Sequence, residues 1–207
     1  FLSVASFFTI LKCYVLLFQV LIFYDDCSVK ASYIKKIKEE IYMDFISWKN
    51  ITLTDGFWKY WQETAAKETS NAIYDRFYET GRIDAMSLDW TPDKPNKPHV
   101  FWDSDIAKWL EGTAYTLYNY PDAALKEKLD TIIEKIEKGQ TEDGYFNSAI
   151  LTLCPNRRFT DRTNHELYTA GHLIEAAVAY YEAFGDTRFL TIMERFADCI
   201  YKVFAED

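Results

Sequence analysis

Apolar residues recur every three or four positions along most of the chain after residue 30, which is the spacing of one buried helix face. Helices are predicted over residues 59–80, 103–120, 122–139, 163–185 and 187–204. The two runs in the middle of the chain show the pattern most clearly, with Ile106, Trp109, Leu110, Ala114, Leu117, Leu125, Leu129, Ile132, Ile133 and Ile136. The hydrophobic pattern therefore predicts a predominantly helical chain.

Capping residues mark several helix boundaries. Gly81 follows the helix predicted over residues 59–80 and is expected to end it, because glycine is common just beyond a helix. Asp103 or Ser104 is expected to cap the next helix, since both side chains accept hydrogen bonds from free backbone N–H groups.

Two stretches break the helical pattern. Residues 46–58 alternate apolar and polar side chains before Asp-Gly, which predicts a short extended segment. Residues 140–148 contain a second Asp-Gly pair at Asp143-Gly144 and predict a turn.

The predicted helices come in pairs, with short connections within pairs and longer ones between them. This arrangement is typical of helical hairpins packed side by side, as in an α/α toroid or a solenoid. The absence of a fixed sequence period argues against tetratricopeptide and ankyrin arrays. The predicted fold class is all-α, an (α/α)6 barrel of which residues 31–207 form about the first half.

Residues 1–30 are treated apart from this fold. Residues 1–24 are apolar enough, at about 1.5 Å per residue, to span a bilayer. Lys12 near the centre would cost about 2.5–3.5 kcal/mol on insertion. A secretion signal, a membrane anchor and sequence from upstream of the true start all stay open. The protein is expected to be secreted or membrane-anchored if this segment is genuine, and cytoplasmic otherwise.

Charge and cysteine usage exclude several classes of function. The net charge is −9, from 32 acidic and 23 basic residues, and no basic stripe is visible, so nucleic acid is not an expected partner. The four cysteines form no CxxC pair, which argues against a zinc ribbon or a redox motif: Cys13, Cys27, Cys154 and Cys199. Aromatic residues make up 17% of the chain and suit either a core or the apolar faces of sugars.

Two histidines lie in the helix predicted over residues 163–185. His165 and His172 are seven residues apart, which is about 10.5 Å of helix rise, so they cannot share one metal ion. With Tyr168 and Glu175 they form one stripe that offers donors and acceptors to a hydroxyl-rich ligand. The alternative is structural, with His165 capping the helix start and His172 paired with Glu175.

A second polar group lies in the stretch DSDIAKWLEG. Asp103, Asp105 and Glu111 could supply the paired carboxylates of glycoside hydrolysis. A structural role is favoured, because Asp at a helix start caps N–H groups and complements the helix dipole. Lys108 is expected to pair with Asp105 or Glu111. These three carboxylates and Glu175 are therefore assigned supporting roles.

Five motifs in order resemble one known family, the β-L-arabinofuranosidases of glycoside hydrolase family 127. The resemblance covers about residues 46–205 and the amino-terminal half of that family's catalytic domain. The motifs are DGFW at 55–58, TGRI at 80–83, FWDSDIAKWLEG at 101–112, QTEDGYFNS at 140–148 and NHELYTAGHLIEAAVAYYEAFGD at 164–186.

The resemblance implies an (α/α)6 barrel that removes terminal β-L-arabinofuranosyl residues with retention of configuration. In that family a cysteine thiolate in a zinc site of three Cys and one Glu is the nucleophile, and a second Glu is the acid/base. Those residues lie in the later half of the barrel and match no stretch here. No catalytic residue, metal ligand or cofactor is therefore expected in this chain, and zinc is expected only in the complete family member.

The resemblance also assigns substrate-binding residues. His165 matches the family's sugar-contacting histidine in the HELY motif, Tyr168 belongs to the same motif, and His172 matches a second motif histidine expected to bind or support the sugar. Thr169 stands where many members carry cysteine. The expected partner is an arabinofuranosyl-containing carbohydrate. Two alternatives stay open: a non-catalytic, membrane-tethered carbohydrate-binding module, and another α/α-toroid sugar enzyme.

Overall fold

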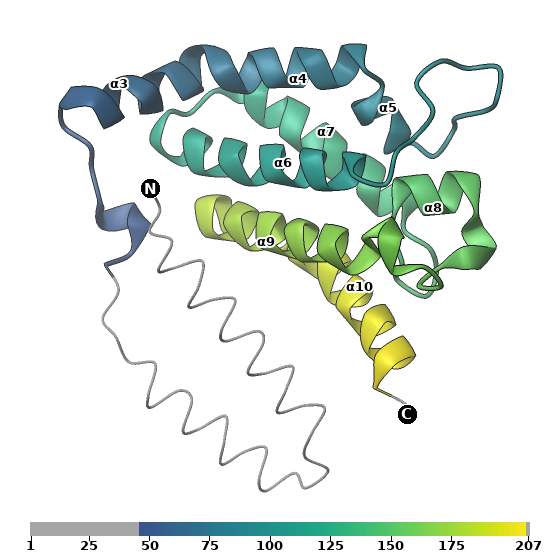
Figure 1. Ribbon diagram of the computed structural model, residues 1–207. Helices are drawn as coiled ribbons and strands as arrows, with labels where there is room; N and C mark the ends of the chain where they lie inside the picture. Colours follow the sequence, from purple (N-terminus) through teal and green to yellow (C-terminus); the bar gives the residue numbers. More distant parts are fainter. Residues whose placement is uncertain (1–45, 206–207) are drawn as a thin grey trace, which may run out of the picture. The chain divides into compact units, whose positions relative to one another are not determined.

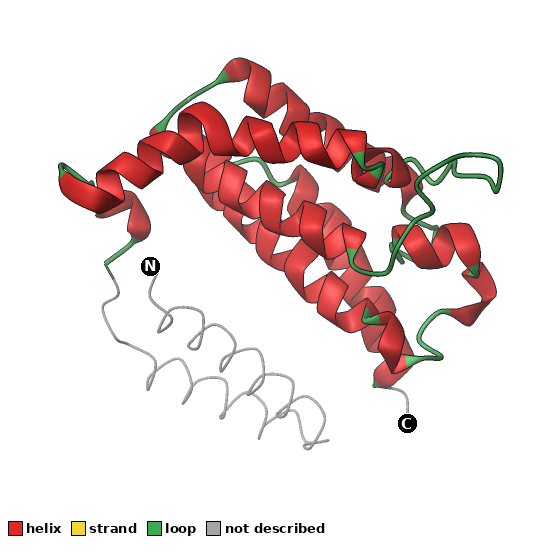
Figure 2. Cartoon of the chain, turned by 45° about the horizontal axis from the view of Figure 1, so that its top comes forward, coloured by secondary structure: helices red, strands yellow, loops and turns green. Residues whose placement is uncertain are grey.

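The computed structural model describes residues 46–205, and these form helices and loops without any strand (Figures 1 and 2). The chain divides into two units between Thr54 and Asp55. In the first unit, the described part contains one 3-10 turn, η1 (Trp48–Asn50).

The prediction of an extended segment over residues 46–58 is wrong at both ends of that range. Its first part forms η1, where the Ser47 hydroxyl accepts a hydrogen bond from the Lys49 N–H. In the second unit a helix already begins at Gly56, because the Asp55 carboxylate accepts the Gly56 N–H at 2.6 Å and caps the helix start. The Asp-Gly pair therefore opens a helix instead of ending a strand.

The second unit begins with a continuous helical stretch whose middle turn is π-helical and therefore wider than a turn of α-helix. This stretch consists of α3 (Gly56–Thr64), the π-helical turn η2 (Ala65–Thr69) and α4 (Ser70–Glu79). The buried Trp109 indole donates to the Ser70 carbonyl at 2.9 Å, just after this turn. The helix predicted over residues 59–80 is confirmed, and so is its end at Gly81, which adopts a left-handed φ of 79°.

The remaining helices surround the pair α6 and α9, which pack along each other. α6 also contacts α4, α5, α7 and α8, whereas α10 packs against α9 and α7 (Figure 1). Their bounds are α5 (Arg82–Ala85), α6 (Trp102–Asn119), α7 (Ala123–Gly139), α8 (Ser148–Leu153), η3 (Pro155–Arg157), η4 (Arg162–Asn164), α9 (Glu166–Phe184) and α10 (Arg188–Phe204).

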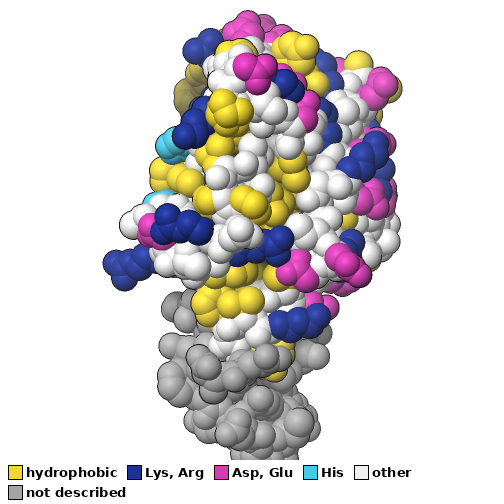
Figure 3. Space-filling view, turned by 90° about the vertical axis from the view of Figure 1, so that its right-hand side faces the viewer, with side chains coloured by type: hydrophobic (Ala, Val, Ile, Leu, Met, Phe, Trp, Pro, Cys, Tyr) yellow, Lys and Arg dark blue, Asp and Glu magenta, His cyan; other side chains and the backbone are white. Residues whose placement is uncertain are grey.

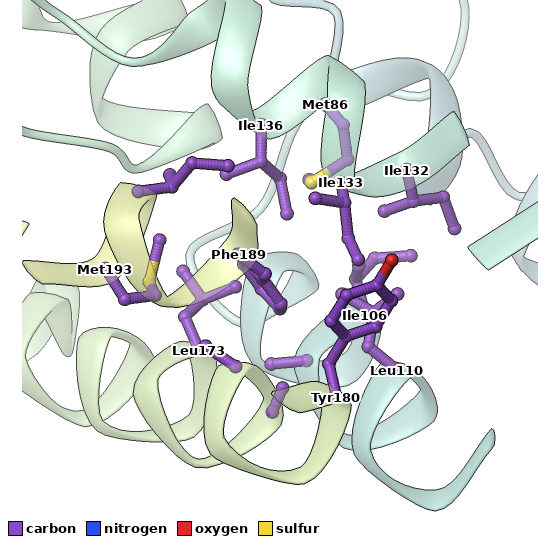
Figure 4. Close-up of a cluster of buried hydrophobic side chains, with 14 of the residues drawn as sticks. Met86, Ile106, Leu110, Ile132, Ile133, Ile136, Leu173, Tyr180, Phe189 and Met193 are labelled. Carbon is purple, nitrogen blue, oxygen red and sulfur yellow. The ribbon is translucent and has the colours of Figure 1, made fainter. Parts of the chain in front are cut away.

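Alanines bring α6 and α9 close together. The α6 side contributes Ala107 and Ala114 and the α9 side Ala170, Ala176 and Ala177, all at most 1% exposed. Larger side chains from α7 and α10 fill the space behind this contact, as Figure 4 shows for Ile132, Ile133, Ile136, Phe189 and Met193. The apolar positions predicted for α6 and α7 are all buried, so this part of the sequence prediction is confirmed.

The paired arrangement of helices is also confirmed. A three-residue connection joins α6 to α7, with Asp122 accepting the Leu125 N–H at 3.0 Å to start α7. A similarly short connection through Gly185 joins α9 to α10. The all-α fold class is therefore correct, with two helical hairpins packed side by side.

None of the helices within residues 46–205 is long and apolar enough to cross a bilayer. The apolar stretch over residues 1–24, on which the secretion and anchor predictions rest, lies outside the described residues.

Gly144→Ala is expected to lower the free energy of unfolding by at least about 2 kcal/mol. Gly144 has a φ of 91°, and a Cβ atom there would lie 2.2 Å from the Arg195 carbonyl oxygen. Gly112→Ala is the control, because a Cβ at that helical position meets no atom within 4 Å. It should stabilise the protein by about 0.5–1 kcal/mol. Urea unfolding of both variants tests this, and equal stabilities would contradict it.

Candidate functional site

His165 lies at a sharp turn directly before α9. Asp161 starts this turn by accepting hydrogen bonds from the Thr163 N–H at 2.9 Å and hydroxyl at 2.6 Å. His165 then adopts a left-handed φ of 54°, and its carbonyl accepts the Thr169 N–H at 2.9 Å. His165 occupies the capping position of α9, as the structural alternative predicted, but its imidazole makes no capping hydrogen bond.

The predicted stripe on α9 is a row of neighbouring rings. The ring centroids of Tyr168 and His172 are 4.6 Å apart and those of His165 and Tyr168 are 6.1 Å apart. Tyr168 remains 45% exposed, so a ligand can reach the middle of the row. The structure therefore brings together the three residues that sequence reasoning assigned to substrate binding.

Two further side chains join this row from α6 and the loop before it. Phe101 lies 4.7 Å from His165, centroid to centroid, and the Lys108 ammonium lies 5.4 Å from the centre of the Tyr168 ring. Sequence reasoning did not place either residue in the site. The residues Phe101, Lys108, His165, Tyr168 and His172 are called the ring face below.

The surroundings of His172 favour its neutral form. Burial lowers its pKa below the usual value of 6.5, and the nearby Lys108 charge lowers it further. Its Nδ1 lies 3.4 Å from Glu175 Oε2. In the neutral imidazole one ring nitrogen is a donor and the other an acceptor, so in that form this contact is not an ion pair.

Two carboxylates continue the polar surface beyond the histidines. Burial raises the pKa of Glu111 on α6, and the negative charge of Glu175 on α9 raises it further. Burial likewise raises the pKa of Glu175. The helices α6 and α9 thus each carry a half-buried acid next to the ring face.

The ion pairs predicted for Lys108 are wrong. The structure places its ammonium over the Tyr168 ring, because α9 packs directly against this side of α6. Asp105 is instead bound by the Arg82 guanidinium, with Nε 3.1 Å from Oδ2.

Asp103 does not cap α6. α6 begins at Trp102, so Phe101 and not Asp103 occupies the capping position. The Asp103 carboxylate is fully buried. It accepts hydrogen bonds from the N–H of Ser148, at 2.6 Å, and from its hydroxyl. Asp103 therefore anchors the first residue of α8 to the start of α6. Burial outweighs these hydrogen bonds and raises the pKa of Asp103 to about 6.

Glu166 fixes the turn that carries His165, a role that sequence reasoning missed. Its buried carboxylate accepts hydrogen bonds from the Tyr145 hydroxyl and from the Phe159 N–H, the latter at 2.8 Å. It also lies in the first turn of α9, where the helix dipole favours a negative charge. The only sequence signal was its place next to His165 at a helix start.

The described residues do not form a metal site. Within residues 46–205, no three side chains among His, Cys, Asp and Glu come together in a way that could hold an ion. The two described cysteines are the half-buried Cys154 and the buried Cys199. This part of the chain therefore does not fit a zinc-bound thiolate.

Comparison with known proteins identifies relatives that cover most of the described region. A family model described as the β-L-arabinofuranosidase, GH127 catalytic domain matches residues 50–207. The chain is 39% identical over 106 residues to the non-reducing end β-L-arabinofuranosidase of Bifidobacterium longum subsp. longum, a match that covers 49% of this chain and 16% of that protein.

Solved structures agree with the sequence comparison. A crystal structure of a GH127 β-L-arabinofuranosidase from Geobacillus stearothermophilus T6 matches with a TM-score of 0.70 and 38% identity, covering 75% of this chain and 26% of that one. A second GH127 β-arabinofuranosidase matches with a TM-score of 0.67 and 28% identity, covering 74% and 26% of the two chains. The matched part thus spans about a quarter of the solved relatives.

The stability lost on Asp103→Asn substitution is expected to depend on pH. The folded-state pKa of about 6 lies above the usual 3.8, so the stabilising contribution of protonated Asp103 is lost as pH rises through 6. The stability advantage of wild type over the variant should therefore shrink by up to about 3 kcal/mol between pH 4 and pH 7.5. Urea unfolding at both pH values tests this, and a constant difference would contradict it.

Lys108→Met is expected to raise the pKa of His172, because the substitution removes a nearby positive charge. NMR titration of the imidazole carbon-bound protons measures this directly, and the chain has only three histidines to assign. Lys202→Met on the exposed end of α10 is the control and should leave the titration unchanged. An unchanged pKa of His172 in the Lys108 variant would show that the ammonium does not act on this ring.

Proposed function

The chain belongs to the GH127 β-L-arabinofuranosidase family, and we propose that it forms the sugar-binding part of a hydrolase that releases terminal β-L-arabinofuranosyl residues. The observation that supports this function best is the exposed ring face, which lies within the matched region. The printed activities of the relatives provide the substrate class.

The ring face has the chemistry that a furanose sugar needs. The half-exposed Tyr168 ring can cover an apolar sugar face, while its hydroxyl and the two imidazoles exchange hydrogen bonds with sugar hydroxyls. A neutral His172 has one donor and one acceptor nitrogen. Because Nδ1 is buried beside Glu175, Nε2 is the nitrogen left to meet a sugar hydroxyl. Glu175 supplies an additional acceptor beside it.

In this proposal the described residues bind and orient the sugar and take no covalent part. Orientation is a real contribution to rate, because a fixed sugar ring presents its anomeric carbon without further loss of rotational freedom. We assign no nucleophile, acid/base or zinc ligand to residues 46–205. The retaining mechanism and its zinc-bound thiolate stay predictions for other parts of the family's catalytic domain.

His165→Ala is expected to lower kcat/KM for a β-L-arabinofuranoside at least tenfold, which corresponds to about 1.4 kcal/mol of lost transition-state binding. The assay is release of L-arabinose by the active protein that contains this chain. His165→Asn should give a similar loss, and asparagine tolerates the left-handed backbone at this position. The pair of variants separates loss of the imidazole from backbone strain.

Tyr168→Ala should reduce kcat/KM in the same direction. Tyr201→Ala is its matched control, because Tyr201 is 56% exposed on α10 and outside the ring face. If the His165 and Tyr168 variants keep wild-type activity, the ring face is not the sugar site.

A further inference from the structure

A half-open pocket of about 410 Å³ is lined by the loop between α5 and α6 together with residues of α5 and α7. Its lining includes Asp84, Ser87, Asp89, Trp90, Lys94 and Lys135 and no residue of the ring face. Known small-molecule pockets begin at about 300 Å³, so this one has room for a single sugar ring. Figure 3 looks at the molecule from the side on which this loop projects in Figure 1 and shows acidic and basic side chains interspersed with hydrophobic ones.

Hydrogen bonds hold the pocket wall in shape. The Trp90 indole donates to the Pro95 carbonyl at 3.0 Å, which fixes the plane of the ring. The Lys94 ammonium donates to the Asp89 carbonyl at 2.8 Å and so closes the loop on itself. A preformed wall loses less conformational entropy when a ligand binds.

The loop is also fastened to the helices on both sides. The Lys135 ammonium on α7 donates to the Ser87 hydroxyl at 2.7 Å. Asn96 packs on Gly81, where a Cβ atom would lie 2.5 Å from the Asn96 Cβ. Leu88 and Asn96 both adopt left-handed backbone, with φ of 57° each, which asparagine tolerates but which is costly for leucine. Leucine in this conformation persists only where the surroundings enforce it.

The polar groups of the pocket balance in charge. Two carboxylates, Asp84 and Asp89, face two ammonium groups, Lys94 and Lys135, and Lys94 pairs with Asp89 at 3.2 Å. A cavity with this balance does not select an anion or a cation. An indole surface beside alternating donors and acceptors instead suits a neutral ligand with many hydroxyl groups.

We propose that this pocket binds a neutral sugar unit, separately from the sugar at the ring face. The choice of ligand class rests on the proposed function, because a protein that handles arabinofuranosyl chains meets neutral pentose units next to the one it releases. The loop that forms the pocket leads directly to Phe101, a member of the ring face. The pocket therefore provides a second point of attachment for a carbohydrate.

The test uses the ¹⁵N-labelled full chain titrated with L-arabinose. The chain has six tryptophans, and Trp90→Phe identifies the indole N–H signal of Trp90 by its disappearance. That signal should shift and saturate in the wild type and also in the His165→Asn variant, whose ring face is altered. A Trp90 signal that does not move, or that moves only with an intact His165, would overturn the proposal.

A matched pair of substitutions tests the polar wall. Asp84→Asn should weaken the sugar affinity reported by Trp90 about tenfold, because it removes a charged acceptor. Asp93→Asn makes the same chemical change on the same loop outside the lining and should stay within about twofold, on the scale of an uninvolved surface group. Equal weakening by both variants would overturn the proposal, and so would tighter binding of a charged sugar acid than of L-arabinose.

These outcomes separate the two sites. If L-arabinose does not shift the Trp90 signal but His165 substitution lowers kcat/KM as expected, only the proposal of a second sugar pocket is overturned. If the Trp90 signal shifts and saturates but His165 substitution leaves kcat/KM unchanged, the proposed function of the ring face is overturned and the pocket remains as the sugar site.

Discussion

The close contact between α6 and α9 is the constraint on which the rest of the structure depends. Alanines on both helices make it possible, and they are among the most completely buried residues of the described chain. A larger side chain at Ala107 or Ala177 would need a movement of the helix backbone, because interiors of this density have no free volume. That movement would carry Lys108 away from the Tyr168 ring. A change in the packing of α6 against α9 would therefore also change the geometry of the ring face.

Two buried carboxylates connect the short segments to this pair of helices. Asp103 joins the start of α6 to the start of α8, and Glu166 joins the start of α9 to Tyr145 and the loop at Phe159. Each carboxylate loses hydration on burial and regains two hydrogen bonds, so removing either partner leaves a buried charge unsatisfied. Both segments also bury apolar side chains, with Tyr145 fully buried and Ile150 2% exposed. Their positions, and with them the turn at His165, depend on these polar contacts.

The helices could be predicted from sequence because each long one carries an apolar face of three- or four-residue spacing. α8 has only six residues, and the π-helical turn η2 lies within one continuous helical stretch, so neither leaves a periodic signal of its own. The stripe of His165, Tyr168 and His172 was predictable for the same reason as the helices, since spacing along one helix fixes it. The partners of Asp103 and Lys108 could not be predicted. Ser148 and Tyr168 come from other parts of the chain, and their contacts replace the pairings expected from neighbours on the same helix.

The two sides of α9 differ in burial and in the kind of side chain that they carry. Its core side consists of alanines and leucine packed against α6 and α10, whereas its other side carries half-exposed rings and acids. A helix needed only for the core would gain little from rings that stay 45% exposed, as Tyr168 does, because an exposed aromatic surface contributes no burial energy. In the proposed function, the sugar covers the half-exposed Tyr168 ring. Because the rings lie outside the core, substitutions there can change binding while the fold persists, which is the separation that a binding surface requires.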